Sequence, residues 1–88
     1  MKAQLIKPNG EIVDIQPDNG KDFKLRELYS LIDCELVEIV YLPNKKIMVV
    51  DEEGKLKVNP IYNEKAPNIA QGHEIVGNAI VCDSKMFR

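Results

Sequence analysis

Residues 35–50, ELVEIVYLPNKKIMVV, carry the clearest structural pattern of the sequence. They contain two runs of β-branched, aliphatic and aromatic residues, which are typical of strands, on either side of Pro43 and Asn44, which favour a turn. Successive side chains of a strand point to opposite faces, and in residues 35–42 both faces are largely apolar. We therefore predict a hairpin whose first strand is central in its sheet and at least partly covered on both sides.

Another hairpin is predicted at the start of the chain. Residues 2–7 (KAQLIK) and 11–16 (EIVDIQ) flank Asn9 and Gly10, which tolerate the positive φ of a tight hairpin turn. Pro17 ends the second run because it has no backbone N–H to donate to a neighbouring strand.

A helix is predicted between the two hairpins. The apolar residues that recur there at the spacing of one helix face are Leu25, Leu28, Tyr29 and Ile32. We expect the side chain of Asp22 to cap the start of this helix, and the helix to end near Asp33. About three turns are not stable alone, so the helix must pack on the sheet.

The second half of the chain is less regular. Residues 51–55 (DEEGK) predict a turn with a permissive backbone at Gly54, and Leu56 and Val58 predict a brief strand. Residues 59–72 show no period, so we predict a loop with at most one helical turn between Tyr62 and Ala66, stopped by Pro67.

The last predicted strand is residues 74–82 (EIVGNAIVC), with Gly77 marking a bulge or a close approach of another chain segment. We expect residues 83–88 to fray; the alternative is that Met86 and Phe87 dock back onto the body.

These elements predict a single small α+β domain over residues 1–88. The expected sheet is antiparallel or mixed, with about five strands and one helix in the order ββαββ-loop-β. A β-grasp-like arrangement has this element order, and a five-stranded, partly closed barrel is the alternative.

Composition excludes several classes of protein. The formal net charge is −2 and the isoelectric point about 5.3, which argues against a general electrostatic grip on nucleic acid. No apolar run approaches the roughly 20 residues of a membrane span. Two cysteines are few for a secreted disulfide scaffold, so we expect free thiols and a cytoplasmic location.

Residues 71–83, QGHEIVGNAIVCD, contain the only histidine, a glutamate beside it and one of the two cysteines. In an extended strand His73 and Cys82 point to opposite faces and lie about 30 Å apart, so they cannot share a metal ion. We predict a solvated His73, a core Cys82, and no metal, cofactor or catalytic residue. Cys34 lies between Asp33 and Glu35 at the end of the helix, where the negative field predicts low thiol reactivity.

Charged residues gather at the turns. Asp51, Glu52 and Glu53 lack the ligand spacing of a calcium loop and are interpreted as a solvated turn. The lysines and arginine near turns are Lys21, Lys24, Arg26, Lys45, Lys46, Lys55 and Lys57. If these turns lie at one end of the sheet they form a local basic edge; otherwise they are solvated or guard an edge strand.

Three segments of the back half resemble a known family. They are the acidic-glycine turn at residues 51–54, the Asn-x-x-Ala motif from Asn63 to Ala66, and the Ile-x-Gly strand at residues 75–82. Together they make the chain similar to the domain-of-unknown-function family three-eight-four-six over roughly residues 1–83. The resemblance implies an accessory protein, of a phage, plasmid or other mobile element, in a bacterial cytoplasm, and it implies no catalytic residues.

The irregular loop supplies the candidate partner-binding residues, which are Tyr62, Asn63, Glu64, Lys65 and His73. An aromatic anchor among polar groups is common at binding surfaces. The alternative is that Ile61 and Tyr62 plug the end of the core while Asn63 caps a helical turn.

We therefore expect a non-enzymatic accessory or regulatory domain that binds another protein, as a monomer or weak homodimer, with no membrane partner. One alternative is a nucleic-acid-associated protein that uses the lysine-bearing turns. A more remote one is an enzyme that uses His73 and nearby carboxylates.

Overall fold

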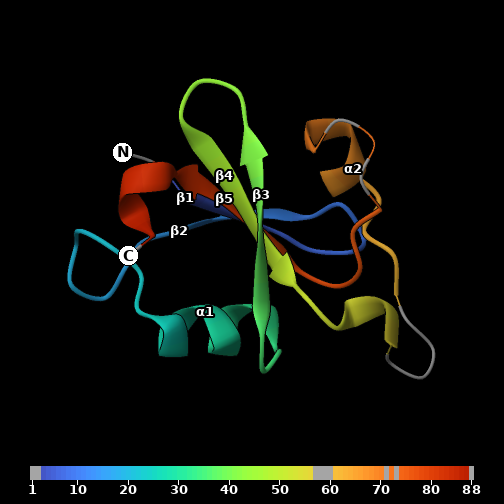
Figure 1. Cartoon of the computed structure of the whole chain (residues 1–88), viewed down its shortest axis with the longest axis horizontal. Helices are drawn as coiled ribbons and strands as arrows, with labels where there is room; N and C mark the ends of the chain where they lie inside the picture. Colours follow the sequence, from blue (N-terminus) through green and yellow to red (C-terminus); the bar gives the residue numbers. More distant parts are fainter. Residues whose placement is uncertain (1–2, 57–60, 71, 73, 88) are drawn as a thin grey trace.

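The computed structural model describes residues 3–56, 61–70, 72 and 74–87 (Figure 1). The elements, in chain order, are strands β1 (Ala3–Ile6) and β2 (Ile12–Ile15), helix α1 (Leu25–Ile32), strands β3 (Val37–Leu42) and β4 (Lys46–Asp51), the 3-10 turn η1 (Gly54–Leu56), the short helix α2 (Ala66–Ile69), strand β5 (Ala79–Asp83) and the 3-10 turn η2 (Ser84–Met86). Within these residues no helix is long and apolar enough to cross a membrane.

The five strands form one antiparallel sheet in the order β2-β1-β5-β4-β3. The α+β class and both predicted hairpins are confirmed. The sheet is not mixed, and it is not a β-grasp, in which the first and last strands are parallel neighbours: here β1 and β5 are antiparallel. It is also no barrel among the described strands, because β2 and β3 are its two open edges.

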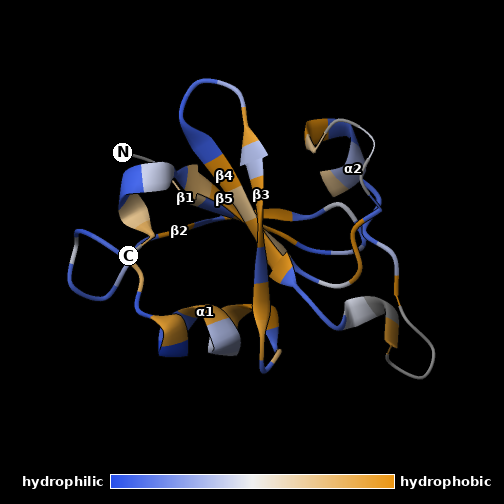
Figure 2. Ribbon diagram, in the orientation of Figure 1, coloured by the Kyte–Doolittle hydropathy of each residue, from blue (hydrophilic) through white to orange (hydrophobic). Residues whose placement is uncertain are grey.

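Both faces of the sheet are covered, and each face has its own core. On the α1 face the buried residues are Ala3, Leu5, Phe23, Leu28, Ile32, Ile47, Val49, Ile80, Cys82 and Met86. On the opposite face, beneath α2, they are Met48, Val50, Ala66, Ala70, Ile75 and Ala79. Figure 1 shows the two helices on opposite sides of the strands, and Figure 2 shows apolar strands joined by hydrophilic turns.

Strand β3, which we predicted to be central, lies at an edge. The strands buried on both faces are β5, at the centre of the sheet, and β4 beside it, where Met48 and Val49 have no exposed surface. The expected alternation of β3 is confirmed, since Val37 and Ile39 pack on one core and Val40 and Leu42 on the other. The error has a topological cause: β5 enters between the two hairpins and pairs with β4, and hydrophobic alternation does not specify such a long-range choice.

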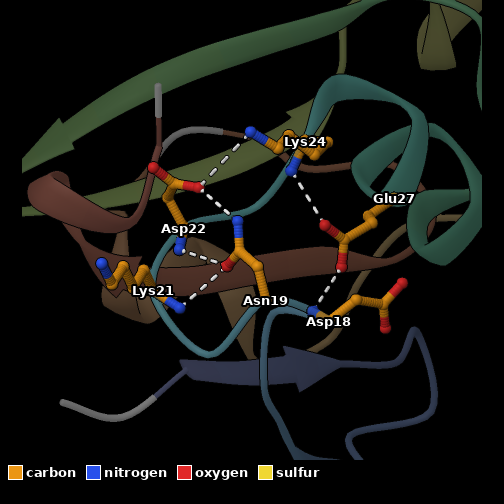
Figure 3. A network of polar contacts seen from close by, with 6 residues as sticks. All are labelled: Asp18, Asn19, Lys21, Asp22, Lys24 and Glu27. Carbon is orange, nitrogen blue, oxygen red and sulfur yellow. Dashed lines mark hydrogen bonds and ion pairs between the residues drawn. The ribbon is translucent and has the colours of Figure 1, made fainter.

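Helix α1 begins at Leu25, directly after Lys24. The prediction that Asp22 caps this helix is wrong. Instead Glu27 closes the first turn, because its Oε1 accepts the Lys24 N–H at 3.0 Å and its Oε2 accepts the Asp18 N–H at 2.9 Å (Figure 3). These two backbone donors, that of Lys24 first, hold the pKa of Glu27 below its usual value. Asp22 lies aside, where its Oδ1 accepts a hydrogen bond from Asn19 Nδ2 at 2.9 Å.

Three other local expectations differ from the structure. The helical turn in the loop is α2, which begins at Ala66 and contains Pro67; proline starts this helix rather than stopping it because the first turn needs no donor N–H. Leu56 lies in a 3-10 turn instead of a strand, and Val58 lies outside the described residues. At Gly54 the constraint is space: an added Cβ would lie 3.0 Å from Val76 Cβ.

Residues 84–87 dock instead of fraying, and Arg88 lies outside the described residues. Residues 84–86 form η2, Met86 is buried in the α1-side core, and Phe87 makes a parallel bridge with Phe23. The Phe23 N–H donates to the Met86 carbonyl at 2.7 Å. Apolar burial and this hydrogen bond offset the entropy of ordering the tail.

Two leucines of α1 provide a matched test of the helix orientation. Leu28 has no exposed surface, whereas Leu25, predicted on the same face, is 46% exposed. We expect Leu28→Ala to lower the free energy of unfolding by about 2–5 kcal/mol, because it leaves a cavity in the core, and Leu25→Ala by less than about 1 kcal/mol. Denaturant unfolding of both variants measures the difference, and equal losses would contradict this placement.

Candidate functional site

Residues 61–66, which we call the strap, cross one end of the sheet. The strap pairs with residues 75–77: the Gly77 N–H donates to the Ile61 carbonyl at 2.8 Å, the Asn63 N–H donates to the Ile75 carbonyl at 2.7 Å, and Tyr62 and Val76 form an antiparallel bridge. The positive φ of 77° at Gly77 accounts for the glycine there.

The strap is also fastened to the first hairpin. The Glu64 N–H donates to the Pro8 carbonyl at 3.1 Å. The stem of Lys65 lies over Gly10, where an added Cβ would be 3.2 Å from Lys65 Cε. The glycine of the hairpin turn, which has a φ of 94°, thus also leaves room for the strap.

Asn63 is the fastening point of the strap. Only 3% of it is exposed, and it is the one buried polar or charged residue among those described. Its Nδ2 donates to the carbonyls of Ile6 and Gly77, each at 2.9 Å. Its Oδ1 accepts the N–H groups of Lys65 at 3.1 Å and Ala66 at 2.9 Å, so that it also satisfies the start of α2.

The structure separates the predicted partner-binding residues. Tyr62, Glu64 and Lys65 are exposed along the strap, with 52% of Tyr62 accessible, whereas Asn63 is buried beneath them. His73 lies outside the described residues. Asn63 therefore fixes the backbone of the strap, and the side chains of the other three residues lie on its exposed surface.

The alternative interpretation of the strap is half confirmed. Asn63 does bond the first N–H groups of a helical turn, as that interpretation predicted. Ile61 and Tyr62 do not plug the core, however, because 66% and 52% of their surfaces are exposed. The strap backbone instead hydrogen-bonds to residues 75–77, and this pairing leaves both side chains largely in solvent.

The predictions for residues 71–83 can be compared with the structure at the described end of this segment. Cys82 lies in the α1-side core with Ile80, and the Asn78 Nδ2 donates to the Leu31 carbonyl at 3.1 Å on the same side. Burial, and secondarily the charge of Asp83, raises the pKa of Cys82 to about 11. Cys82 and Cys34 are not bridged. In the described part of the chain no His, Cys, Asp and Glu residues group as metal ligands.

The lysine-bearing turns do not share one end of the sheet. Lys45 precedes β4 and Lys46 is its first residue, whereas the segment that carries Lys55 follows the other end of that strand. Lys57 lies outside the described residues. Lys45 and Lys46 instead approach the η2 segment: the Ser84 N–H donates to the Lys45 carbonyl at 2.9 Å, and Lys46 faces Asp83 across the sheet. At the acidic turn Asp51 Oδ1 accepts the Glu53 N–H at 2.9 Å, as a solvated turn requires.

A broad hollow lies between α1 and the loop after β2. Its lining consists of Ile15, Gln16, Asp18, Asn19, Lys24, Leu25, Arg26, Glu27, Ser30 and Leu31. Figure 3 shows how the loop is held: Asn19 Oδ1 accepts the N–H groups of Lys21 at 2.8 Å and Asp22 at 3.0 Å. Asn19 and Glu27, two of the polar residues that line the hollow, thus hold the loop itself.

The sequence analysis missed two features: the hydrogen bonds by which Asn19 and Glu27 hold the loop after β2, and the open edge at β3. The hydrogen bonds have a local signal, because Asn19 and Glu27 each follow the pattern of a side chain that bonds backbone N–H groups two or three residues away. The β3 edge has no local signal, since its position depends on the insertion of β5.

Asn63 provides a test of the strap. In Asn63→Ala the Ile6 and Gly77 carbonyls and two N–H groups lose their partner, so we expect the free energy of unfolding to fall by about 2–4 kcal/mol. Asn63→Asp keeps the acceptor but turns a carboxylate toward two carbonyl oxygens, which raises the pKa of the new acid in the folded state. The Asp variant should therefore be more stable relative to wild type at low pH than at neutral pH. Denaturant unfolding at both pH values checks this, and a pH-independent difference would contradict it.

Cys82 provides a pH test. Its pKa is about 11 in the folded chain, above the value of about 8.5 for an unfolded cysteine, so its contribution to stability is complete below pH ~8.5 and is lost as the pH rises through ~11. We expect the free energy of unfolding of wild type to decline more steeply between about pH 8 and pH 11 than that of Cys82→Ala. Parallel pH profiles of the two proteins would show that the thiol does not titrate as its burial predicts.

Comparison with known proteins identifies the family and little else. A family model described as "Domain of unknown function (DUF3846)" matches residues 1–86. No curated protein and no solved structure matches the chain. The match covers every described helix, strand and 3-10 turn, and it confirms the resemblance seen in the acidic-glycine turn, the Asn63 motif and the last strand. The chain belongs to the DUF3846 family.

Proposed function

We propose that this domain is a non-enzymatic accessory protein that binds a protein partner through the exposed side of the strap, at Tyr62, Glu64 and Lys65. The observation that carries the proposal is that an exposed aromatic side chain stands on a backbone fixed from below by the four hydrogen bonds of Asn63.

A fixed aromatic side chain suits protein recognition for energetic reasons. Tyrosine is enriched among the residues that carry most binding energy, because it buries a large area with few rotatable bonds. When its backbone is already ordered, association does not have to bear the entropy of ordering the loop. Ile61, the residue before Tyr62, is 66% exposed as well.

The charged neighbours support the same use. Glu64 and Lys65 follow Tyr62 on the strap and are both exposed, so an apolar centre is flanked by charges of both signs. That arrangement is typical of an interface with a polar rim, where charges favour the correct partner more than they add affinity. His73, which we also predicted at this surface, extends the proposal beyond the described residues.

The cellular setting is part of the proposal. We infer an accessory or regulatory protein of a phage, plasmid or other mobile element, acting in a bacterial cytoplasm as a monomer or weak homodimer. The two unbridged cysteines support a reducing compartment.

A double variant tests the strap surface. We expect Tyr62→Ala with Lys65→Ala to lose at least about tenfold of partner binding while keeping the wild-type melting temperature within a few degrees, because neither side chain is buried. The measurement is capture of proteins from lysate of the source organism on the tagged domain, followed by titration of the recovered partner.

The matched control removes the same kinds of group elsewhere. Leu25→Ala with Lys21→Ala changes an exposed apolar residue and an exposed lysine near α1, and it should bind the partner like wild type. Equal binding by wild type and the Tyr62 and Lys65 variant would remove the strap from the proposal.

A nucleic-acid partner is the second candidate. The observation that favours it is the approach of Lys45 and Lys46 to the η2 segment, which carries the exposed Lys85. The net charge of −2 weighs against it. Nuclease treatment of the lysate separates the two candidates: a protein partner persists after treatment, whereas an association through nucleic acid disappears.

A further inference from the structure

The β3 edge of the sheet lacks the usual protection against strand pairing. Native edges are commonly short, or carry lysine, proline or a bulge. The opposite edge follows this rule, because β2 has four residues, includes Asp14 and is soon followed by Pro17. Strand β3 has six residues, VEIVYL, with Glu38 as its single charge. Figure 1 shows β3 in front of the other strands, with no described element beyond it.

The hydrogen-bond pattern tells which backbone groups face outward. The Glu52 N–H donates to the Leu36 carbonyl at 3.0 Å, so Leu36 directs its backbone polar groups toward β4. These directions alternate along an antiparallel strand, so Glu38 and Val40 also face β4. The N–H and C=O groups of Val37, Ile39 and Tyr41 therefore point away from the sheet, in the geometry that a further strand requires.

The side chains of the same three residues form one stripe. By alternation they lie on the α1 face, where Val37 and Ile39 pack at the margin of the core. Tyr41 is 82% exposed, an unusual position for an aromatic residue in a strand. A neighbouring strand would bury its ring without any change in the rest of the domain.

We propose that a second copy of this chain occupies the edge, with β3 pairing antiparallel to β3 of the other copy about a two-fold axis at Ile39. A two-fold contact uses the same surface on both copies, so each residue must be compatible with the residue that the rotation places opposite it. With the axis at Ile39, Ile39 faces its own copy and Val37 faces Tyr41, a β-branched and aromatic pair that stabilises sheets.

Neighbouring registers are worse for identifiable reasons. An axis at Glu38 sets two carboxylates directly opposite each other, which is destabilising. An axis at Val40 sets Val37 against Pro43, which has no N–H to donate. With the axis at Ile39, Glu38 faces Val40, and each outward group of Val37, Ile39 and Tyr41 finds a partner.

Charge favours the same antiparallel arrangement. The chain before β3 carries the exposed Glu35, whereas the turn after β3 carries the exposed Lys45. Antiparallel pairing brings the start of one β3 next to the end of the other, so Glu35 of each copy lies near Lys45 of its mate. With the axis at Ile39, Glu35 faces Pro43 of the other copy, which lies in the same turn as Lys45.

Sedimentation velocity on the reduced full chain tests the proposal. We expect the weight-average mass of wild type to rise from monomer toward dimer as concentration increases into the upper micromolar range. Tyr41→Pro removes one outward N–H and the exposed ring but leaves the bonds to β4, so it should fold and dimerise at least about tenfold more weakly. Tyr41→Thr, which keeps the N–H, is the matched control and should lie between the two.

A charge exchange tests the register without altering the strand. Glu35→Lys and Lys45→Glu should each weaken dimerisation several-fold, because each sets like charges together, and the combined variant should recover wild-type association. A single monomeric species for wild type up to about 1 mM would overturn the proposal and leave the edge to a strand of another protein. Dimerisation unaffected by Tyr41→Pro, or charge variants without mutual rescue, would also overturn it.

Discussion

The structure depends on the burial of β4 and β5 on both faces. Met48 and Val49 of β4, and Ala79 and Ile80 of β5, alternate between two cores and have no exposed surface. A sheet with two apolar faces must be covered twice, because each uncovered face would lose the free energy of apolar burial. In a chain of 88 residues one helix can cover only one face, so the irregular segment after β4 must cover the other.

That requirement explains the strap. A loop laid across a sheet brings backbone polar groups out of water, and each of them needs a hydrogen-bond partner. Asn63 satisfies four such groups at once and thereby joins β1, the approach to β5 and the start of α2. The same side chain that completes the fold also fixes the exposed Tyr62, which links stability to the proposed binding surface through a single residue.

The two proposed interaction surfaces arise from different properties of the sheet. The strap surface exists because one face needed a cover, and its side chains point outward once the backbone is bonded. The β3 edge exists because an open sheet must end somewhere, and the end holds an apolar strand with little protection. The strap binds residues 75–77 and the first hairpin, so a partner on the strap and a second copy on β3 use different backbone groups.

Local sequence patterns are enough to specify most of the individual elements. The alternation of β3 and β4, the Asn9-Gly10 turn and the spacing of Leu28 and Ile32 are local patterns, and each predicted its element correctly. Four other features follow from the tertiary arrangement: β5 lies between the hairpins, β3 is an edge, Asn63 is buried and Tyr62 is exposed. These outcomes depend on contacts between residues far apart in the chain, such as Asn63 with Ile6, and no local periodicity encodes them.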